Sequence, residues 1–205
     1  MSDDIKYTDK GIPSSELQDA EAAYAADSVH YTYTDYCSWE DGKRWELIDG
    51  IPIEMNSPSR VHQEISGELF FQLKSFLKGK PCEVYAAPFD VRLNADGADD
   101  TVVQPDLLVV CAHDKLDDKS CISAPDLIIE IQSPSTTRHD RITKLNLYRK
   151  YGVREYWMVE PDDKTVQVCI LENGQYVITG YDDGDTVPVS VLPGLEISLP
   201  DVFAT

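Results

Sequence analysis

The alternation of apolar and polar residues predicts two short elements ahead of the first long helix. Thr34 is of a type that caps helices, and we expect a short helix from it through Trp39. In the segment 44–55, apolar and polar residues alternate around Asp49-Gly50, a dipeptide typical of tight hairpin turns. We therefore expect a β-hairpin there. Residues 1–30 show no clean period, and we interpret them as an acidic, poorly ordered arm.

Two amphipathic helices are predicted further along the chain. The first begins at Ser57 or Ser59 and ends near Lys78. Its apolar face is formed by Ile65, Leu69, Leu73 and Phe76. The second runs over about 138–151, and Gly152 closes it.

The remaining segments have a strand-like pattern. Residues 82–93, 101–111 and 126–132 are rich in Val, Ile and Leu, and a strand followed by a meander is expected over 155–181. The segment 126–132 is apolar on both faces, which is typical of a central strand. The order of elements predicts an α/β (α+β) domain over 31–205. It has a mixed central β-sheet flanked by helices, an N-terminal hairpin and a C-terminal β meander.

Two acidic residues interrupt the most apolar strands. Glu130 lies within DLIIEIQ and Asp106 within VVQPDLLVVC, so both are expected in the core. A buried charge requires a partner, and two carboxylates on neighbouring strands can hold a divalent cation. Alternatively, each carboxylate pairs with an arginine, a lysine or a backbone amide. Asp126 shares the strand and face of Glu130 but lies about 13 Å away at about 3.3 Å per residue, so we interpret it as a strand-start or turn residue.

The net charge of −19 argues against tight, non-specific binding to DNA, because proteins that do this are usually basic. The charge is unevenly distributed. Residues 1–30 hold seven acidic residues against two lysines, whereas residues 138–154 hold six Arg or Lys against one acidic residue. We therefore expect a local basic strip on an acidic domain.

The five cysteines are scattered and include no C-x-x-C pair. We expect reduced thiols packed as small apolar residues, rather than a zinc site or a disulfide framework. No apolar run approaches the roughly 20 residues that cross a bilayer, and the acidic, polar start lacks the features of a signal peptide. These observations predict a cytoplasmic protein with no membrane partner.

Five segments of the chain, in order across about 31–200, carry a resemblance to a known family. They are WELIDG (45–50), SPSRVHQEISGEL (57–69), VVQPDLLVV (102–110), APDLIIEIQSPST (124–136) and KLNLYRKYGVREYWMVEP (144–161). Together they resemble the Uma-type family of restriction-endonuclease-like proteins, in the PD-(D/E)XK nuclease superfamily. The resemblance implies a three-layer nuclease core and an Mg²⁺-dependent endonuclease that hydrolyses phosphodiester bonds in DNA, with Mn²⁺ as an alternative metal. Asp106 and Glu130 would then be the metal ligands.

One departure from the superfamily pattern concerns the lysine that normally follows the acid by two residues. Here Gln132 occupies that place, and an amide supplies no positive charge. The resemblance points instead to Lys144 in the following helix. Lys144 shares a partly apolar stripe with Leu147, Tyr148 and Tyr151. A lysine in such a stripe can also extend its ammonium to the surface without any catalytic role.

Two further residues are candidates for the site. His62 lies on the inward face of the first long helix, where a single histidine usually satisfies core hydrogen bonds. Glu46 matches the glutamate of the family's E-L-I-D-G segment, which suggests a place near the metal, although a strand-edge salt bridge explains it equally well. The expected contacts to the DNA backbone are Arg138, Arg141 and Arg149.

The alternative to a nuclease is a catalytically silent protein of the same fold that acts as a binding or assembly module. Gln132 and the charge of −19 favour this alternative, whereas the intact Asp106, Glu130 and Lys144 oppose it. The sequence is compatible with a homodimer but does not decide the oligomeric state.

Overall fold

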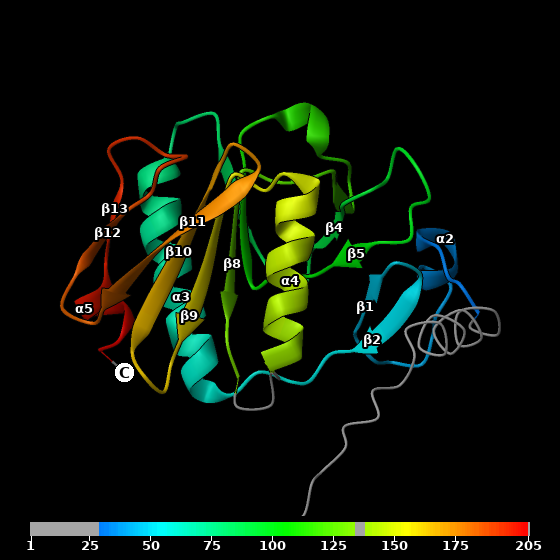
Figure 1. The fold of residues 1–205 in the computed structure, drawn as a ribbon, viewed down its shortest axis with the longest axis horizontal. Helices are drawn as coiled ribbons and strands as arrows, with labels where there is room; N and C mark the ends of the chain where they lie inside the picture. Colours follow the sequence, from blue (N-terminus) through cyan, green and yellow to red (C-terminus); the bar gives the residue numbers. More distant parts are fainter. Residues whose placement is uncertain (1–28, 134–137, 205) are drawn as a thin grey trace, which may run out of the picture. The chain divides into compact units, whose positions relative to one another are not determined.

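The central element is a six-stranded sheet in the order β11-β10-β9-β8-β6-β3. The computed structural model describes residues 29–133 and 138–204 (Figure 1). The bounds of these strands are β3 Glu83–Ala86, β6 Leu107–Val110, β8 Leu127–Ile131, β9 Glu155–Glu160, β10 Thr165–Glu172 and β11 Gln175–Asp182. β8 runs parallel to β9 and antiparallel to β6. The sheet is therefore mixed, as the sequence predicts.

Two long helices, α3 (Arg60–Leu77) and α4 (Arg138–Tyr151), cover opposite faces of this sheet. The buried apolar residues of α3 share a hydrophobic cluster with Leu107, whereas Leu147 of α4 shares one with Leu108. Successive side chains of a strand point to opposite faces, so the two clusters lie on opposite sides of β6. The predicted sheet flanked by helices is confirmed, and β8 lies between the two helical layers.

A second sheet of five strands, in the order β2-β1-β5-β4-β7, is not predicted by the sequence. Its strands are β1 Trp45–Ile48, β2 Ile51–Glu54, β4 Asp90–Arg92, β5 Val102–Val103 and β7 Ser120–Ile122. The segments 82–93 and 101–111, each predicted as one strand, divide between the two sheets. Pro88 and Pro105 lie at the divisions, because proline lacks the N–H that a continuous ladder requires.

Local signals set the ends of the long helices and of the N-terminal hairpin. Ser59 caps α3 by accepting a hydrogen bond from His62 N at 3.2 Å. Gly152 follows α4 with a φ of 81°, which glycine adopts readily. Asp49 and Gly50 have φ of 46° and 77°, as a two-residue type I′ turn requires. The predicted bounds of these elements are confirmed.

The predicted cap of the first short helix is wrong. The helix α2 spans Tyr33–Tyr36 and is capped by Thr32 rather than Thr34. Thr32 and Asp35 form a capping box, in which each side chain accepts from the backbone N–H of the other. This reciprocal pair satisfies two backbone donors at once, whereas a cap at Thr34 would leave Asp35 without that role.

The prediction of reduced cysteines is wrong for one pair. Cys82 and Cys111 form a disulfide, and their Cα atoms are 3.9 Å apart. Antiparallel pairing of β3 with β6 places Glu83 opposite Val110, and one further step of that register brings the two cysteines together. The spacing of cysteines along the chain cannot reveal a contact that depends on strand register. Cys121 and Cys169 are buried and free, as expected.

The remaining elements lie between β6 and β7 in the chain and after β11. They are the 3-10 helix His113–Lys115, the strands β12 (Thr186–Pro188) and β13 (Glu196–Ser198), and the helix α5 (Leu199–Val202). β12 and β13 pair as a separate two-stranded sheet. The arm predicted over 1–30 falls outside the described residues except at its last two positions, and it stays a prediction.

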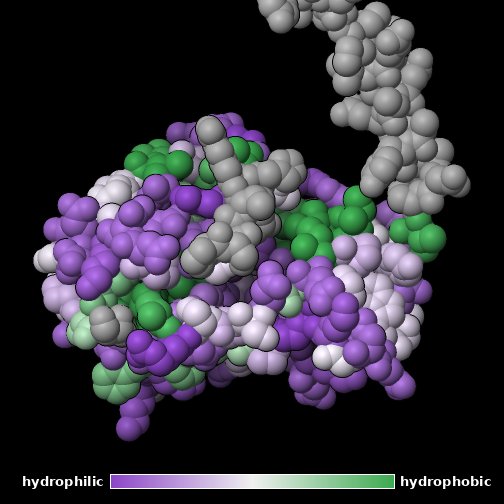
Figure 2. All heavy atoms as spheres, turned by 90° about the horizontal axis from the view of Figure 1, so that it is seen from below, coloured by the Kyte–Doolittle hydropathy of each residue, from purple (hydrophilic) through white to green (hydrophobic). Residues whose placement is uncertain are grey.

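Hydrophilic residues cover most of the face seen in Figure 2, and hydrophobic ones form separate patches. In the described ranges, none of the helices combines the length and the apolar character that crossing a bilayer demands.

Leu69→Ala should lower the free energy of unfolding by about 2–5 kcal/mol, because truncating a buried leucine leaves a cavity. Leu69 is fully buried in the cluster between α3 and the central sheet. Phe71→Ala is the matched control, since Phe71 lies on the same helix but is 64% exposed. Its effect should stay within about 0.5 kcal/mol. Urea unfolding measures both, and equal losses would contradict the assignment of the faces of α3.

Candidate active site

β6 and β8 bring two acidic residues to one position of the central sheet. Their antiparallel register pairs Leu107 with Ile129, and one further step places Asp106 opposite Glu130. The side chain of Glu130 is 9% exposed and that of Asp106 is 18% exposed. Asp106 and Glu130, which lie far apart in the sequence, therefore form a pair of carboxylates that is largely buried.

Asp106 is fixed through one of its carboxylate oxygens. Oδ2 accepts a hydrogen bond from Ile131 N at 2.8 Å and lies 3.1 Å from Nε2 of His62, in the first turn of α3. Burial lowers the pKa of His62, but the hydrogen bond and charge of Asp106 outweigh burial and raise the pKa overall. The imidazole is thus held as a donor to Asp106.

Glu130 is contacted by two side chains from one face of α4. Lys144 Nζ donates to Glu130 Oε1 at 2.9 Å, and the Tyr148 hydroxyl donates to the same oxygen at 2.6 Å. Lys144 and Tyr148 are four residues apart, so they lie on the same side of the helix. Lys144 Nζ also donates to Glu46 Oε1 at 3.0 Å, and Glu46 accepts from Gln104 N at 3.0 Å. One ammonium therefore joins buried carboxylates from the two larger sheets.

Burial and neighbouring charge act in opposite directions on these groups. The pKa of Glu130 is raised to about 7: burial raises it most, the Lys144 ammonium opposes this rise, and the charges of Asp106 and Glu46 add to it. Burial lowers the pKa of Lys144, but attraction by Glu130 and Glu46 holds that pKa well above its ordinary value. Lys144 is therefore charged at neutral pH. Glu130 and Glu46 face one ammonium, and Asp106 adds its charge beside Glu130, which favours the entry of a further cation.

The oxygen ligands that the carboxylate pair offers fit Mg²⁺. Within residues 29–133 and 138–204, Asp106 Oδ1 and Glu130 Oε2 have no hydrogen-bond donor, because the donors contact the other oxygen of each group. The same part of the chain contains no cluster of three or more His, Cys, Asp or Glu side chains suited to a metal. Mg²⁺ needs no such cluster, since it keeps several waters and is usually bound by one or two carboxylates.

Gln132 follows β8 and is buried. Its backbone N–H donates to Val159 O at 2.8 Å. Its side-chain Oε1 is buried and, as far as the described chain extends, has no hydrogen-bond partner. Such an atom calls for an explanation in a native protein, and a bound water or ligand donor is one.

Two of the three arginines predicted to bind the DNA backbone have partners inside the protein. Arg141 Nη2 lies 2.5 Å from Glu160 Oε1, and Arg149 Nη1 donates to Gln175 Oε1 at 2.6 Å. The side chain of Arg138 lies outside the described residues. The basic strip is therefore largely engaged in internal contacts.

Asp126 has the structural role predicted for it. It directly precedes β8, its Oδ2 accepts from Cys111 N at 2.8 Å, and its Oδ1 accepts from Arg154 at 2.8 Å.

The sequence places Tyr148 only in an apolar stripe of its helix and does not identify it as a residue of the site. The signal that could have identified it was its spacing of four residues from Lys144, which places its hydroxyl beside the same carboxylate.

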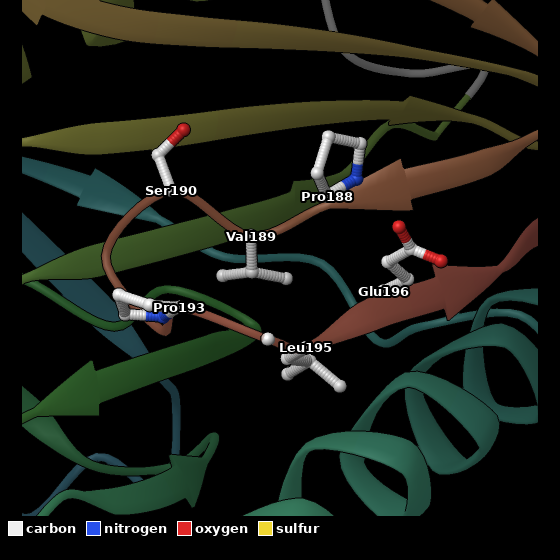
Figure 3. Close-up of a pocket in the computed structure, with 7 residues that line it drawn as sticks. Pro188, Val189, Ser190, Pro193, Leu195 and Glu196 are labelled. Atoms are coloured by element: carbon white, nitrogen blue, oxygen red, sulfur yellow. The ribbon is translucent and has the colours of Figure 1, made fainter.

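A hollow beside the turn between β12 and β13 does not include any candidate residue (Figure 3). It is lined by Pro188, Val189, Ser190, Pro193, Gly194, Leu195 and Glu196. Val189 and Leu195 also belong to the hydrophobic core, and Glu196 is the single ionisable residue of the lining. The hollow therefore lacks the converging polar groups of a catalytic site.

Comparison with known proteins gives similarities of three kinds. The family model "Uma2: Putative restriction endonuclease" matches residues 32–200. The uncharacterized protein slr1290 of Synechocystis sp. is 27% identical over 176 residues, which are 82% of this chain and 89% of that protein. The crystal structure of "a putative nuclease belonging to DUF820" from Anabaena variabilis is similar with a TM-score of 0.70 and 23% identity. That similarity covers 85% of this chain and 98% of the other, and it shows a shared fold.

Tyr148→Phe should lower the free energy of unfolding by about 1.5–3 kcal/mol, because it removes a hydrogen bond to a buried charged group. Tyr156→Phe is the matched control: both tyrosines are fully buried and their rings are 4.9 Å apart. The Tyr156 hydroxyl is buried with no partner in the described part of the chain, so its removal should be neutral or stabilising. Urea unfolding in chelator measures both, and equal losses would contradict the assigned role of Tyr148.

Proposed function

Because the chain belongs to the Uma2 family of restriction-endonuclease-like proteins, we propose that it is an Mg²⁺-dependent endonuclease that hydrolyses phosphodiester bonds in DNA. One observation carries the proposal: Asp106 and Glu130 lie opposite each other, and Lys144 donates to Glu130 at 2.9 Å. Two carboxylates that can bind a cation, beside a fixed positive charge, form a set suited to a reaction in which negative charge grows on phosphate.

The ligands in this proposal are Asp106 and Glu130, through the oxygens that have no protein donor in the described ranges. Mn²⁺ is an alternative, since it prefers the same oxygen ligands. When bound, the cation supplies Lewis-acid polarisation of the scissile phosphate.

The surrounding residues have distinct proposed roles. Lys144 offsets the negative charge that builds on the phosphate, or orients the attacking water. His62 and Tyr148 hold Asp106 and Glu130 in fixed orientations, as groups hydrogen-bonded to ligands commonly do. Glu46 fixes the Lys144 ammonium by a second contact at 3.0 Å.

Substrate contacts are proposed for Gln132 and for three arginines of α4. The unpaired Oε1 of Gln132 accepts a hydrogen bond from a water near the phosphate. The arginines bind the DNA backbone; they are Arg138, Arg141 and Arg149. Arg141 exchanges its contact with Glu160 for a phosphate in this arrangement.

A catalytically silent binding or assembly module is the second candidate. Two observations favour it: the Lys144 ammonium is already paired with Glu130 and Glu46, and the net charge of −19 opposes contact with DNA. The two candidates differ in cleavage of DNA, because a silent module can retain the cation site without activity.

Metal binding should stabilise the folded protein. Millimolar Mg²⁺ or Mn²⁺ should raise the melting temperature of the wild type, with a gain of about 2.7 kcal/mol when the metal concentration is 100 times Kd. Asp106→Asn and Glu130→Gln should abolish the rise. Asp126→Asn is the matched control, since this buried carboxylate precedes the same strand but bonds to Cys111 and Arg154. Differential scanning fluorimetry gives the result, and a rise that survives in both site variants would refute the proposed ligands.

Cleavage of plasmid DNA with Mg²⁺ or Mn²⁺ should fall by at least about 100-fold in Lys144→Met and in Glu130→Gln, because each loses charge at the reacting phosphate. Lys115→Met is the matched control: Lys115 is half-buried and donates to Ala124 O at 2.7 Å, away from the site. Far-UV circular dichroism establishes that each variant is folded.

The variant Gln132→Lys in the Lys144→Met background should recover part of the activity by restoring a positive charge on the strand. Undiminished cleavage by Lys144→Met would rule out the role proposed for Lys144. A wild type that binds metal but cleaves no DNA would favour the silent module.

A further inference from the structure

β11 is an unprotected edge of the central sheet. It pairs with β10 over Gln175–Asp182 on one side, and no strand of the described chain pairs with its other side (orange in Figure 1). Residues 177–180 are all exposed, including Val177 at 50% and Ile178 at 49%. Neighbouring residues point to opposite faces of a strand, so apolar surface is exposed on both faces of this edge.

The other edges of the two larger sheets have features that oppose pairing with another chain. β2 exposes Ile51 and Ile53 but has Pro52 between them, and proline cannot donate to a ladder. β3 and β7 are short strands of 4 and 3 residues. β11 has 8 residues and contains no proline, lysine or arginine. Its single charged residue, Asp182, stands at its end.

The sequence of β11 is complementary to itself in an antiparallel arrangement. When a two-fold axis runs perpendicular to the sheet through one residue of β11, that residue lies opposite the same residue of the second copy. With Ile178 on the axis, Val177 faces Thr179 of the second copy, and Tyr176 faces Gly180. Cross-strand pairs of β-branched residues stabilise sheets. Asp182 then faces Gly174, so no like charges meet.

We propose that β11 pairs with β11 of a second copy of this chain and joins two central sheets into one continuous sheet. The backbone N–H and C=O groups on the open side of β11 form ladder hydrogen bonds in the dimer, and Val177 and Ile178 lose exposed apolar surface. The contact is isologous, because the same strand supplies both sides, and it therefore closes as a dimer.

Sedimentation equilibrium of the full chain tests the dimer. The wild type should show twice the 23.0 kDa mass of one chain at high protein concentration. Ile178→Lys should give the single-chain mass, because two ammonium groups then face each other at the axis. The fold should persist, since Ile178 is half exposed, and circular dichroism verifies this. Ile51→Lys is the matched control: Ile51 is 54% exposed on the edge that contains Pro52, and this variant should remain a dimer.

Cysteine cross-linking tests the register. Residues directly opposite in antiparallel strands have Cα atoms about 4.5–5.5 Å apart, within the range of about 4.4–6.8 Å that a disulfide spans. Oxidation of Ile178→Cys should therefore yield a covalent dimer, whereas Gln175→Cys should not, since it faces Tyr181 of the second copy. The wild type, with its exposed Cys37, gives the background. The proposal is overturned by a single-chain mass of the wild type at every concentration. A dimer that Ile178→Lys leaves intact, or equal cross-linking of the two cysteine variants, also overturns it.

Discussion

The buried ammonium of Lys144, shared by Glu130 and Glu46, is the contact on which the arrangement of this domain depends. Glu130 lies in the middle layer, on a strand that is otherwise apolar, and its ionised form is costly there without a partner. Removing one partner of such a buried pair typically costs about 3–5 kcal/mol. The ammonium comes from α4, and Glu46 comes from the second sheet. This ion group therefore holds α4 against β8, and it holds the N-terminal hairpin of β1 and β2 beside both.

The same contact sets the chemistry of the site. Lys144 and Tyr148 occupy one oxygen of Glu130, and His62 and Ile131 occupy one oxygen of Asp106. The other oxygens keep their capacity to bind a cation, and Glu130 and Glu46 on one ammonium, with Asp106 beside Glu130, leave an excess of negative charge. In the proposed enzyme this excess attracts the metal. The superfamily places a positive charge on the strand. In the proposed enzyme Lys144 supplies this charge from α4, on the same face of the sheet.

The parts of the fold that local signals determine were predictable from the sequence. Apolar spacing and Ser59 located α3, Gly152 located the end of α4, and Asp49-Gly50 located the hairpin. The disulfide and the second sheet were not predictable, because both depend on which strands pair and in which register. Strand parity predicted that Asp106 and Glu130 are neighbours. The family resemblance pointed to Lys144 and Glu46, and the partly apolar stripe of its helix agreed for Lys144. No local pattern connects these residues, which lie far apart in the chain.

The central claim is that Asp106 and Glu130 bind one catalytic cation beside Lys144. Anomalous diffraction from crystals grown with Mn²⁺ tests it most directly, because it locates the metal independently of activity. The account predicts one anomalous peak in contact with Asp106 and Glu130, with the Lys144 ammonium still bonded to Glu130. An empty site at saturating Mn²⁺, or a peak bound by other residues, would contradict it.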